Sequence, residues 1–206
     1  MTAKKTIYLI RHGETDYNKN GIIQGSGINS NLNNNGFMQA KLFYMAYRHI
    51  PFDKIYTSEL SRTFQSVEPF VKDGFRFEKM PELNEINWGM MEGAMPTKVN
   101  QIHYNQMIED WKNGFFEKCV ENGESPLQLY KRQKTGLEKI LTKNNENTIL
   151  ICMHGRALRS FLCLLLNIPL SKMEDFKHSN LCLYILKQKT FNEFEILLEN
   201  STEHLW

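Results

Sequence analysis

The sequence predicts an α/β fold, with a three-layer α/β/α arrangement around a mostly parallel central sheet. Two continuous apolar runs, residues 6–10 and 148–152, have the length of strands but lack the alternation of a half-exposed strand. Such runs favour strands that are covered on both faces. Stretches with helical periodicity separate the strand candidates along the chain, and this alternation is typical of parallel sheets flanked by helices.

Each element of this arrangement has its own local signal. Strands are expected where short apolar or β-branched runs occur, at residues 6–10, 54–56, 148–152 and 181–186, with a candidate edge strand at residues 191–198. Helices are expected where apolar residues recur at helical spacing, at residues 36–49, 58–71, 127–142 and 155–166. In open sheets of this kind, ligands bind beyond the carboxyl ends of the strands.

The middle of the chain is weakly marked. Residues 90–147 carry several helical patches and no convincing strand, and they predict a helical insertion over the active-site end of the sheet, a natural substrate lid. No linker or internal repeat is visible, so residues 1–206 are expected to form a single domain. The asparagine-rich stretch at residues 29–35 is expected to be a solvated loop.

The composition argues against several classes of function. The 206 residues carry a net charge of +2 and no long basic run, which disfavours binding to nucleic acid or to a membrane surface. The longest apolar stretch, residues 161–166, is too short to span a bilayer, and the first five residues lack the core of a signal peptide. The four cysteines show no Cys-x-x-Cys spacing, which favours free thiols and a cytoplasmic protein.

Two similar blocks carry the chemistry. In the first, the apolar run at residues 7–10 delivers Arg11 and His12 into a turn opened by Gly13, and in the second an apolar run delivers His154 ahead of another glycine. An imidazole beside a guanidinium suits attack on phosphorus, because the cation holds the phosphate oxygens. Since both histidines follow strands, they are expected to meet across one crevice.

A second cation is expected from Arg62. Ser58 is placed as the N-cap of the helix after the second strand, which puts Arg62 in the first helical turn. Helix N-termini and guanidinium groups both favour phosphate. At about 5 Å and an effective dielectric of about 20, each unit charge pair contributes roughly 3 kcal/mol before desolvation. The alternative is that Arg62 is a solvated helix arginine.

These blocks resemble the histidine phosphatase superfamily, which contains cofactor-dependent phosphoglycerate mutases, fructose-2,6-bisphosphatase and many small phosphatases. The resemblance runs from about residue 5 to about residue 186 and includes the Arg-His-Gly-Glu-Thr string at residues 11–15. A family pattern Ser-x-Leu-x-Arg-x-x-Gln is matched by Ser58, Leu60, Arg62 and Gln65. The resemblance implies that His12 is the nucleophile and that His154 donates to the phosphoryl oxygens in the transition state.

Further contacts are implied by the same resemblance. The positions that match Asn18 and the backbone of Gly25 are expected to bind phosphate. Asn180, before the last strand, is similar to a family position near the phosphate, although an asparagine there also suits a turn cap.

A proton donor for the leaving group is expected between residues 81 and 93. Residues 83–93 match a family arrangement Leu-x-Glu-x-x-x-Gly-x-x-Glu-Gly. In the family, the first glutamate after the leucine, here Glu85, acts as general acid and then as the base that activates water. Glu82 is the competing acid and is expected to face solvent, whereas Glu92 is expected to bond backbone near the site.

One loop departs from the family. Many members carry Asp-x-Pro-Leu-Thr-x-x-Gly here; this chain keeps Leu32 and Gly36 but has asparagine at positions 29, 31 and 33. The departure leaves the rigidity of the loop and the cap of the following helix open. No expected catalytic group is affected.

The sequence therefore predicts a metal-independent phosphomonoesterase that hydrolyses small-molecule phosphate esters through a phosphohistidine at His12, with no cofactor and no metal site. The main alternative is a cofactor-dependent phosphoglycerate mutase, which is less favoured because such mutases are usually longer. A non-catalytic phosphate-binding regulator is a third class. The resemblance is compatible with a homodimer, but nothing in the sequence decides the oligomeric state.

The substrate itself is not identified. Six residues are candidates either for an apolar pocket that binds an organic body or for ordinary core, namely Trp88, Met90, Met91, Trp111, Phe115 and Phe116. The remaining histidines carry no motif and are expected on the surface or in helices: His49, His103, which could touch substrate, His178 and His204.

Overall fold

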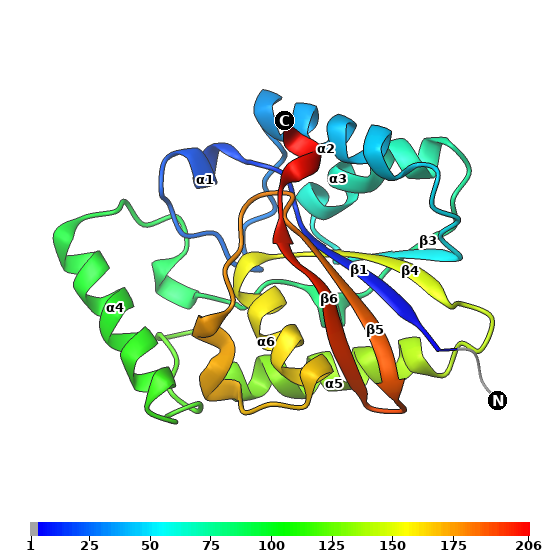
Figure 1. Ribbon diagram of the computed structural model, residues 1–206. Helices are drawn as coiled ribbons and strands as arrows, with labels where there is room; N and C mark the ends of the chain where they lie inside the picture. Colours follow the sequence, from blue (N-terminus) through cyan, green and yellow to red (C-terminus); the bar gives the residue numbers. More distant parts are fainter. Residues whose placement is uncertain (1–3) are drawn as a thin grey trace.

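The computed structural model, which describes residues 4–206, has the predicted three-layer α/β/α arrangement (Figure 1). Six strands form one sheet in the order β3-β2-β4-β1-β5-β6. The strands are β1 (Thr6–Arg11), β2 (Lys54–Thr57), β3 (Phe77–Lys79), β4 (Thr148–Met153), β5 (Leu183–Thr190) and β6 (Glu193–Ser201). The first four are parallel to one another, and β5 and β6 run antiparallel at the other edge.

Helices cover both faces of the sheet. The α-helices are α1 (Asp16–Lys19), α2 (Asn34–Tyr47), α3 (Ser61–Lys72), α4 (Lys98–Lys112), α5 (Pro126–Leu141) and α6 (Gly155–Leu166). Short 3-10 helices are η1 (Pro81–Leu83), η2 (Gly89–Met91), η3 (Leu170–Asp175) and η4 (Glu203–Leu205). In Figure 1, α2 and α3 lie on one side of the sheet, and α5 and α6 lie on the other.

The alternation of side chains along β1 explains why the sheet needs two covers. Ile7 and Leu9 belong to the core cluster that includes α5 and α6, whereas Ile10 belongs to the cluster that includes α2 and α3. Successive strand residues point to opposite faces, so a continuous apolar run is stable only between two layers. The inference from the apolar runs to a doubly covered sheet is confirmed.

The register of the central strands determines where the site forms. Arg11 at the end of β1 pairs with Met153 at the end of β4, and Thr57 of β2 pairs with Cys152 of β4. The next residues, His12, His154 and Ser58, therefore leave the sheet at one edge. Neighbouring strands lie about 4.8 Å apart, which brings these three side chains within reach of each other.

Two differences from the expected strands have local causes. The edge strand β3 was not expected, because its three residues, Phe-Glu-Lys, are exposed and carry little apolar signal. β5 begins at Leu183, two residues later than expected, because Leu181 adopts a left-handed conformation with φ of 53° and its N–H bonds the carbonyl of Arg11. That turn ties the start of β5 to the end of β1.

The asparagine-rich stretch begins as the solvated loop that we expected, since residues 29–33 form neither helix nor strand and Asn29 and Asn31 are exposed, but its side chains also bond the neighbouring helices. Asn33 caps α2, since its side-chain oxygen accepts from the Gly36 N–H at 2.9 Å. Asn29 accepts from the N–H of Ser61 at 2.7 Å, and Asn31 accepts from the side chain of Gln65 at 3.0 Å. Asparagine therefore supplies the helix cap that the missing threonine would have supplied, and the loop is bonded to α3.

The expected N-cap at Ser58 is wrong. Helix α3 begins at Ser61 with Leu60 at its N-cap and no side-chain cap. The Ser58 hydroxyl is used instead by His154, Thr63 and the Leu60 N–H. Arg62 nevertheless lies in the first turn of α3, as expected.

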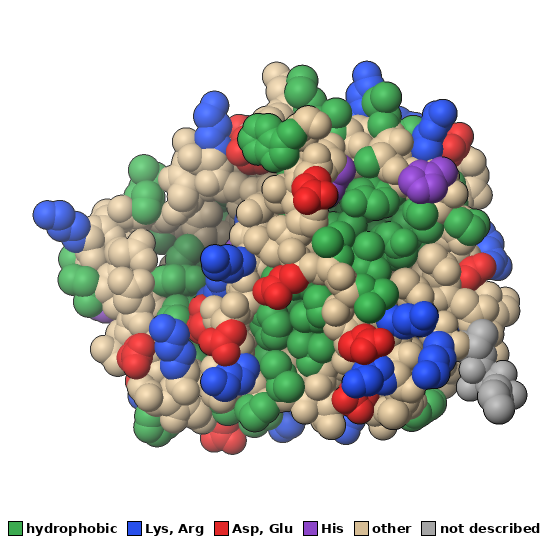
Figure 2. Space-filling view, viewed as in Figure 1, with side chains coloured by type: hydrophobic (Ala, Val, Ile, Leu, Met, Phe, Trp, Pro, Cys, Tyr) green, Lys and Arg blue, Asp and Glu red, His purple; other side chains and the backbone are tan. Residues whose placement is uncertain are grey.

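The expected insertion divides into two parts. Helix α5 packs beside α6 under the sheet, whereas α4 lies at the side of the molecule in Figure 1 and packs onto the core through the buried Trp111. Among the described residues, no helix combines the length and the hydropathy that a membrane crossing requires. On the face that Figure 2 shows, side chains of both charges are interspersed.

Gly36→Ala is expected to destabilise the protein, although alanine normally favours helices. A Cβ at this position would lie 2.1 Å from the backbone oxygen of Glu14, so α2 and the segment after His12 would have to separate. Overpacking of this kind costs about 1–3 kcal/mol, which outweighs a helix-propensity gain of about 1 kcal/mol or less. Urea denaturation measures the change.

Asn35→Ala is the matched control, because Asn35 is the preceding residue in the same helical turn and is exposed. Its free energy of unfolding should stay within about 0.5 kcal/mol of the wild-type value. A Gly36→Ala protein as stable as this control would contradict the close approach of the two segments.

Candidate active site

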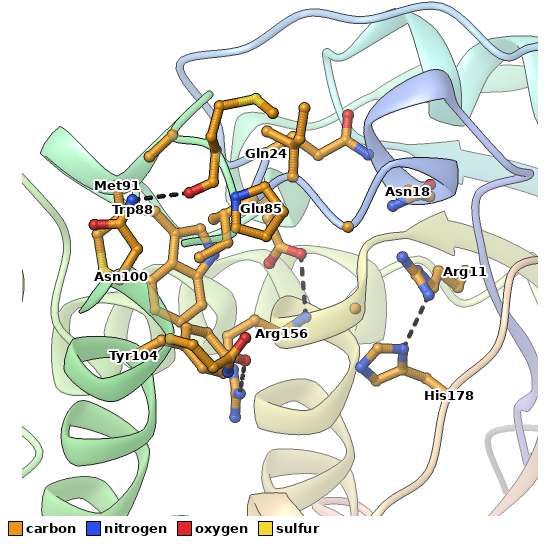
Figure 3. A pocket seen from close by; sticks show the side chains of 18 of the residues that line it. Arg11, Asn18, Gln24, Glu85, Trp88, Met91, Asn100, Tyr104, Arg156 and His178 are labelled. Atoms are coloured by element: carbon orange, nitrogen blue, oxygen red, sulfur yellow. Dashed lines mark hydrogen bonds between the residues drawn. The ribbon is translucent and has the colours of Figure 1, made fainter. Parts of the chain in front are cut away.

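A cavity with a volume of about 270 Å³ opens at the carboxyl ends of β1 and β4. Its wall includes Arg11 at the end of β1, His12 directly after it, Gly155 and Arg156 at the start of α6, and Asn18 of α1. Figure 3 shows Arg11 and His178 on one side and Trp88 and Tyr104 on the other, with Glu85 between them. The cavity thus has a cationic end and an aromatic end.

His12 is held in one tautomer. Its backbone N–H donates to the Met153 carbonyl at 3.0 Å, which fixes the residue at the end of β1. Its ring nitrogen Nδ1 lies 2.7 Å from the carbonyl oxygen of Gly13. Because a carbonyl only accepts, the proton of the neutral ring is on Nδ1, and Nε2 keeps its lone pair. A lone pair on Nε2 is the requirement for a nucleophilic imidazole.

The surroundings keep His12 neutral. Burial and then the positive charges of Arg62 and Arg11 hold its pKa well below the ordinary value of 6.5, and the hydrogen bond to Gly13 only partly opposes this. Charging the ring would place a third cation beside two guanidinium groups in a desolvated site. At neutral pH the imidazole is therefore unprotonated and competent to attack.

His154 lies next to His12, with 5.2 Å between the ring centroids. Its Nδ1 accepts from Arg62 Nε at 3.1 Å, so its proton lies on Nε2, 2.8 Å from the Ser58 hydroxyl oxygen. Burial and the charge of Arg62 keep its pKa well below 6.5. Its one N–H is engaged with Ser58, so the expected contact with a phosphoryl oxygen requires an exchange of that hydrogen bond.

Arg62 is fully buried behind the cavity. Besides His154, its guanidinium donates to the carbonyl oxygens of Ile28 at 2.7 Å and Gly25 at 3.1 Å. Arg62 and Gly25 were each expected at the phosphate, but they contact each other and neither residue lines the cavity. Because all these partners are neutral, the positive charge of Arg62 remains available to an anion.

Arg11 has a partner that we did not expect. Its Nη1 lies 3.1 Å from Nδ1 of His178, and its Nε is buried without a hydrogen-bond partner among residues 4–206. Burial and the charge of Arg11 lower the pKa of His178 to about 2, so Nδ1 accepts and Nε2 carries the proton. The cavity wall therefore includes a second neutral imidazole.

One indirect signal for His178 is the glycine at position 155. A Cβ on Gly155 would lie 2.9 Å from the His178 ring, so glycine after His154 lets this ring close over the start of α6. The other three histidines without a motif, namely His49, His103 and His204, do not line the cavity. His103 is exposed on α4, and the suggested contact of His103 with substrate has no support.

Asn18 and Asn180 meet at the cavity edge. Asn180 donates from its side-chain nitrogen to the carbonyl of His12 at 3.0 Å and to the Asn18 oxygen at 3.1 Å. Asn18 lines the cavity, whereas Asn180 does not. Asn180 therefore buttresses the His12 backbone and orients Asn18.

Glu85 lines the cavity and caps α6. Its Oε1 accepts from the N–H groups of Ile86 and Ala157 at 2.9 and 2.8 Å, and its Oε2 accepts from the N–H of Arg156 at 3.1 Å. These bonds fix the carboxyl group beside the helix that follows His154. The position suits proton transfer to a group bound at His12.

The other acids lie elsewhere. Glu82 does not face solvent freely, because its carboxylate pairs with Lys139 of α5, and it does not line the cavity. Glu92 accepts from the N–H groups of Trp88 at 3.0 Å and Gly27 at 3.3 Å. The expected backbone contact of Glu92 is confirmed, and Glu85 is the acid that faces the cavity.

Only part of the expected apolar pocket is present. Trp88 and Met91 line the cavity, whereas Trp111 is core and Phe116 packs against it. Met90 and Phe115 are exposed. Instead, α4 contributes Tyr104, Asn100 and Gln101, which no motif had marked.

Polar bonds hold α4 against the cavity wall. Arg156 donates from its Nη2 to the hydroxyl oxygen of Tyr104 at 3.2 Å, and its Nη1 pairs with the carboxylate of Glu174 in η3. The guanidinium of Arg156 lies 5.3 Å from the ring centroid of Trp111 and 5.9 Å from that of Trp88.

Residues 4–206 contain no group of three His, Cys, Asp or Glu side chains placed to hold a metal ion.

Comparisons with known proteins identify a family. The family model of the Histidine phosphatase superfamily (branch 1) matches residues 7–202. Phosphoserine phosphatase 1 of Hydrogenobacter thermophilus is 28% identical over 200 residues, which cover 97% of this chain and 93% of that protein. A probable phosphoglycerate mutase GpmB from Yersinia enterocolitica is 32% identical over 165 residues, 79% of this chain and 75% of that protein.

A solved structure extends the comparison to three dimensions. Phosphoserine phosphatase from Entamoeba histolytica, in complex with 3-phosphoglyceric acid, superimposes with a TM-score of 0.81 at 26% identity. The match covers 98% of this chain and all of that chain (100%).

The buried neutral histidines predict a stability that falls in mild acid. His12 and His154 resist protonation when folded but protonate near pH 6.5 when unfolded, so the unfolded state binds more protons below that pH. The free energy of unfolding should therefore decrease as the pH falls from about 6.5 to 5, by up to about 1.4 kcal/mol per pH unit for each histidine. Urea denaturation across this range measures the slope.

His12→Gln provides the control, because it removes one of the two groups and keeps a polar side chain. Its slope should be shallower by about 1.4 kcal/mol per pH unit. Identical slopes in both proteins would show that His12 is not held neutral by the fold.

Proposed function

Because the chain belongs to the histidine phosphatase superfamily, we propose that it is a metal-independent phosphomonoesterase that hydrolyses small-molecule phosphate esters through a phosphohistidine at His12. The observation that carries the proposal is the state of His12: a neutral imidazole with its proton fixed on Nδ1 by the Gly13 carbonyl. Such a ring presents Nε2 as a nucleophile. Relatives that are named as phosphatases support the same reaction.

The charges around His12 suit a phosphate dianion. Arg62 bonds carbonyl oxygens and an imidazole, and Arg11 bonds an imidazole. Two other arginines nearby differ, because Arg156 and Arg159 both pair directly with the carboxylate of Glu174. The two guanidinium groups beside His12 thus keep their net charge for the substrate, which is the arrangement that stabilises phosphoryl transfer.

In the first step, Nε2 of His12 bonds to phosphorus while the bond from phosphorus to the ester oxygen breaks. Glu85 gives its proton to that oxygen, so an alcohol leaves and Glu85 becomes a carboxylate. In the second step, Glu85 takes a proton from water as the water oxygen attacks phosphorus. The bond between nitrogen and phosphorus breaks, inorganic phosphate is released and His12 returns to its initial state.

The cavity suits a small organic phosphate. Its aromatic end, with Trp88, Met91 and Tyr104, would contact the organic body, and the amides of Gln24 and Asn100 offer hydrogen bonds. Relatives named for phosphoserine and for adenosylcobalamin/alpha-ribazole act on such compounds, so both types of ester belong in a first substrate panel. We place the enzyme in the cytoplasm and expect no cofactor.

A phosphoglycerate mutase is the second candidate, since one relative is named as a probable member of that class. A mutase returns the phosphoryl group to the substrate instead of to water. Incubation with 3-phosphoglycerate and its bisphosphate primer distinguishes the two: isomerisation faster than release of inorganic phosphate would favour the mutase.

The proposed function predicts that p-nitrophenyl phosphate is hydrolysed in excess EDTA and that His12→Ala removes the activity. The nucleophile is a side chain and the phosphate is held by guanidinium groups, so chelation should leave the rate unchanged. The variant should lose at least about 1000-fold, as nucleophile removal does in other covalent mechanisms. Loss of wild-type activity in EDTA, or retained activity in the variant, would contradict the proposal.

Glu85→Gln should distinguish leaving groups. Nitrophenolate departs with little need of a proton, whereas an alkoxide requires one. The variant should therefore lose about 100-fold or more in kcat on an alkyl phosphate and much less on p-nitrophenyl phosphate, since acid catalysis contributes about 10²–10⁴-fold. Glu82→Gln is the matched control and should leave both rates near wild type; equal losses in Glu85→Gln would exclude Glu85 as the acid.

A further inference from the structure

The segment that carries Glu85 lacks regular structure of its own. Residues 84–88 lie between η1 and η2 and form neither helix nor strand. Their backbone groups therefore have no ladder of hydrogen bonds, and partly buried carbonyl groups require partners from elsewhere. A side chain of α5 provides them.

Arg132 binds this segment with its whole guanidinium. Its Nη1 donates to the carbonyl oxygens of Glu82 at 3.0 Å and Asn84 at 2.9 Å, and its Nη2 donates to that of Glu85 at 2.9 Å. The remaining donors, on Nε and Nη2, bond both carboxylate oxygens of Glu124 at 2.6 and 2.8 Å. All five N–H groups are thus used in one planar arrangement.

Glu124 extends the same support to the far side of Glu85. Its Oε2 accepts from the Asn87 N–H at 3.3 Å, and its own N–H donates to the Asn87 carbonyl at 2.7 Å. The Arg132–Glu124 pair therefore holds the backbone on both sides of the proposed acid. Arg132 itself does not line the cavity.

We infer that Arg132 is a positioning residue, which acts on catalysis by fixing where the carboxyl group of Glu85 stands. The side chain of Glu85 is bound to α6 and its backbone is bound to Arg132 of α5. Together, these two sets of hydrogen bonds fix the position of the Glu85 carboxyl group relative to His12. This inference rests on the proposed function, because it concerns the proton that Glu85 delivers.

The Arg132–Glu124 ion pair contributes little to the free energy of folding by its charge alone. About a quarter of the Arg132 side chain is exposed (24%), as is 17% of the Glu124 side chain, and solvent weakens such pairs. What the guanidinium adds is geometry: a lysine ammonium has three donors on a single atom and cannot reach Glu124 and three carbonyls together.

The test compares two esters in variants of the full chain. Arg132→Met should lower kcat on an alkyl phosphate by about 10- to 100-fold, the usual range for a residue that orients a functional group. Its kcat on p-nitrophenyl phosphate should change much less, because that leaving group barely needs Glu85. Arg132→Lys should show the same selective loss and keeps a cation in place if the methionine variant does not fold.

Lys139→Met is the matched control. Lys139 also lies on α5, but it bonds only the side chain of Glu82, in η1 just before the segment. Both rates should stay within about twofold of wild type. In the double variant Glu85→Gln/Arg132→Met, the alkyl phosphate should be hydrolysed no more slowly than by Glu85→Gln alone, because a misplaced acid and an absent acid remove the same step.

The outcomes separate the inference from its premise. If Glu85→Gln is selective but both Arg132 variants slow the two esters equally, or if the losses add in the double variant, the positioning role is overturned and the phosphatase proposal stands. If Glu85→Gln is itself unselective, the assignment of Glu85 as the acid is overturned, and this inference with it.

Discussion

The parallel register of β1 and β4 is the constraint on which the site depends. Arg11 pairs with Met153, and the next N–H, that of His12, donates to the Met153 carbonyl. The two histidines therefore leave neighbouring strands at the same height, and their rings lie 5.2 Å apart. A shift of one residue would turn every side chain of β1 to the other face and would move His12 away from His154. Because Ile7, Leu9 and Ile10 are all buried between helical layers, the hydrophobic core enforces the register that catalysis needs.

The partners of the buried arginines distinguish a binding site from a structural support. Arg132, Arg156 and Arg159 each pair with a carboxylate, and the three join α5, α6 and η3 to their surroundings. Arg11 and Arg62 bond only carbonyl oxygens and imidazoles. Their charge is therefore balanced by no acid in direct contact, which costs folding free energy but leaves a field that favours a dianion. The same field keeps His12 unprotonated, so in the proposed function one arrangement both binds phosphate and prepares the nucleophile.

The parts that the sequence predicted have strong local signals. Continuous apolar runs gave the central strands and the doubly covered sheet, and the blocks around His12 and His154 gave the centre of the site. Local sequence patterns did not predict the contacts of side chains whose partners are distant in the chain. Ser58 was read as a helix cap because serine suits one, yet its hydroxyl bonds His154, 96 positions away. His178 and Tyr104 carry no motif, and only the packing of the turn before β5 and of α4 brings them to the cavity. The asparagines at positions 29 and 31 are exposed, as expected, but their hydrogen bonds to α3 carried no signal in the sequence.

The start of α6 shows how the acid and the phosphate share one region. A helix N-terminus is a ready anion site, but here the N–H groups of Arg156 and Ala157 are taken by Glu85. In the proposed function, a bound phosphate is therefore held by the groups after β1 and by neutral donors such as His178 and Asn18, with the charge of the buried Arg62 behind them. In the proposed mechanism, the helix amides hold Glu85 independently of the phosphate, so that its carboxyl group loses its proton to the leaving-group oxygen and remains in place to accept one from water. The irregular backbone that brings Glu85 to these amides then requires side-chain support of its own, and Arg132 supplies it.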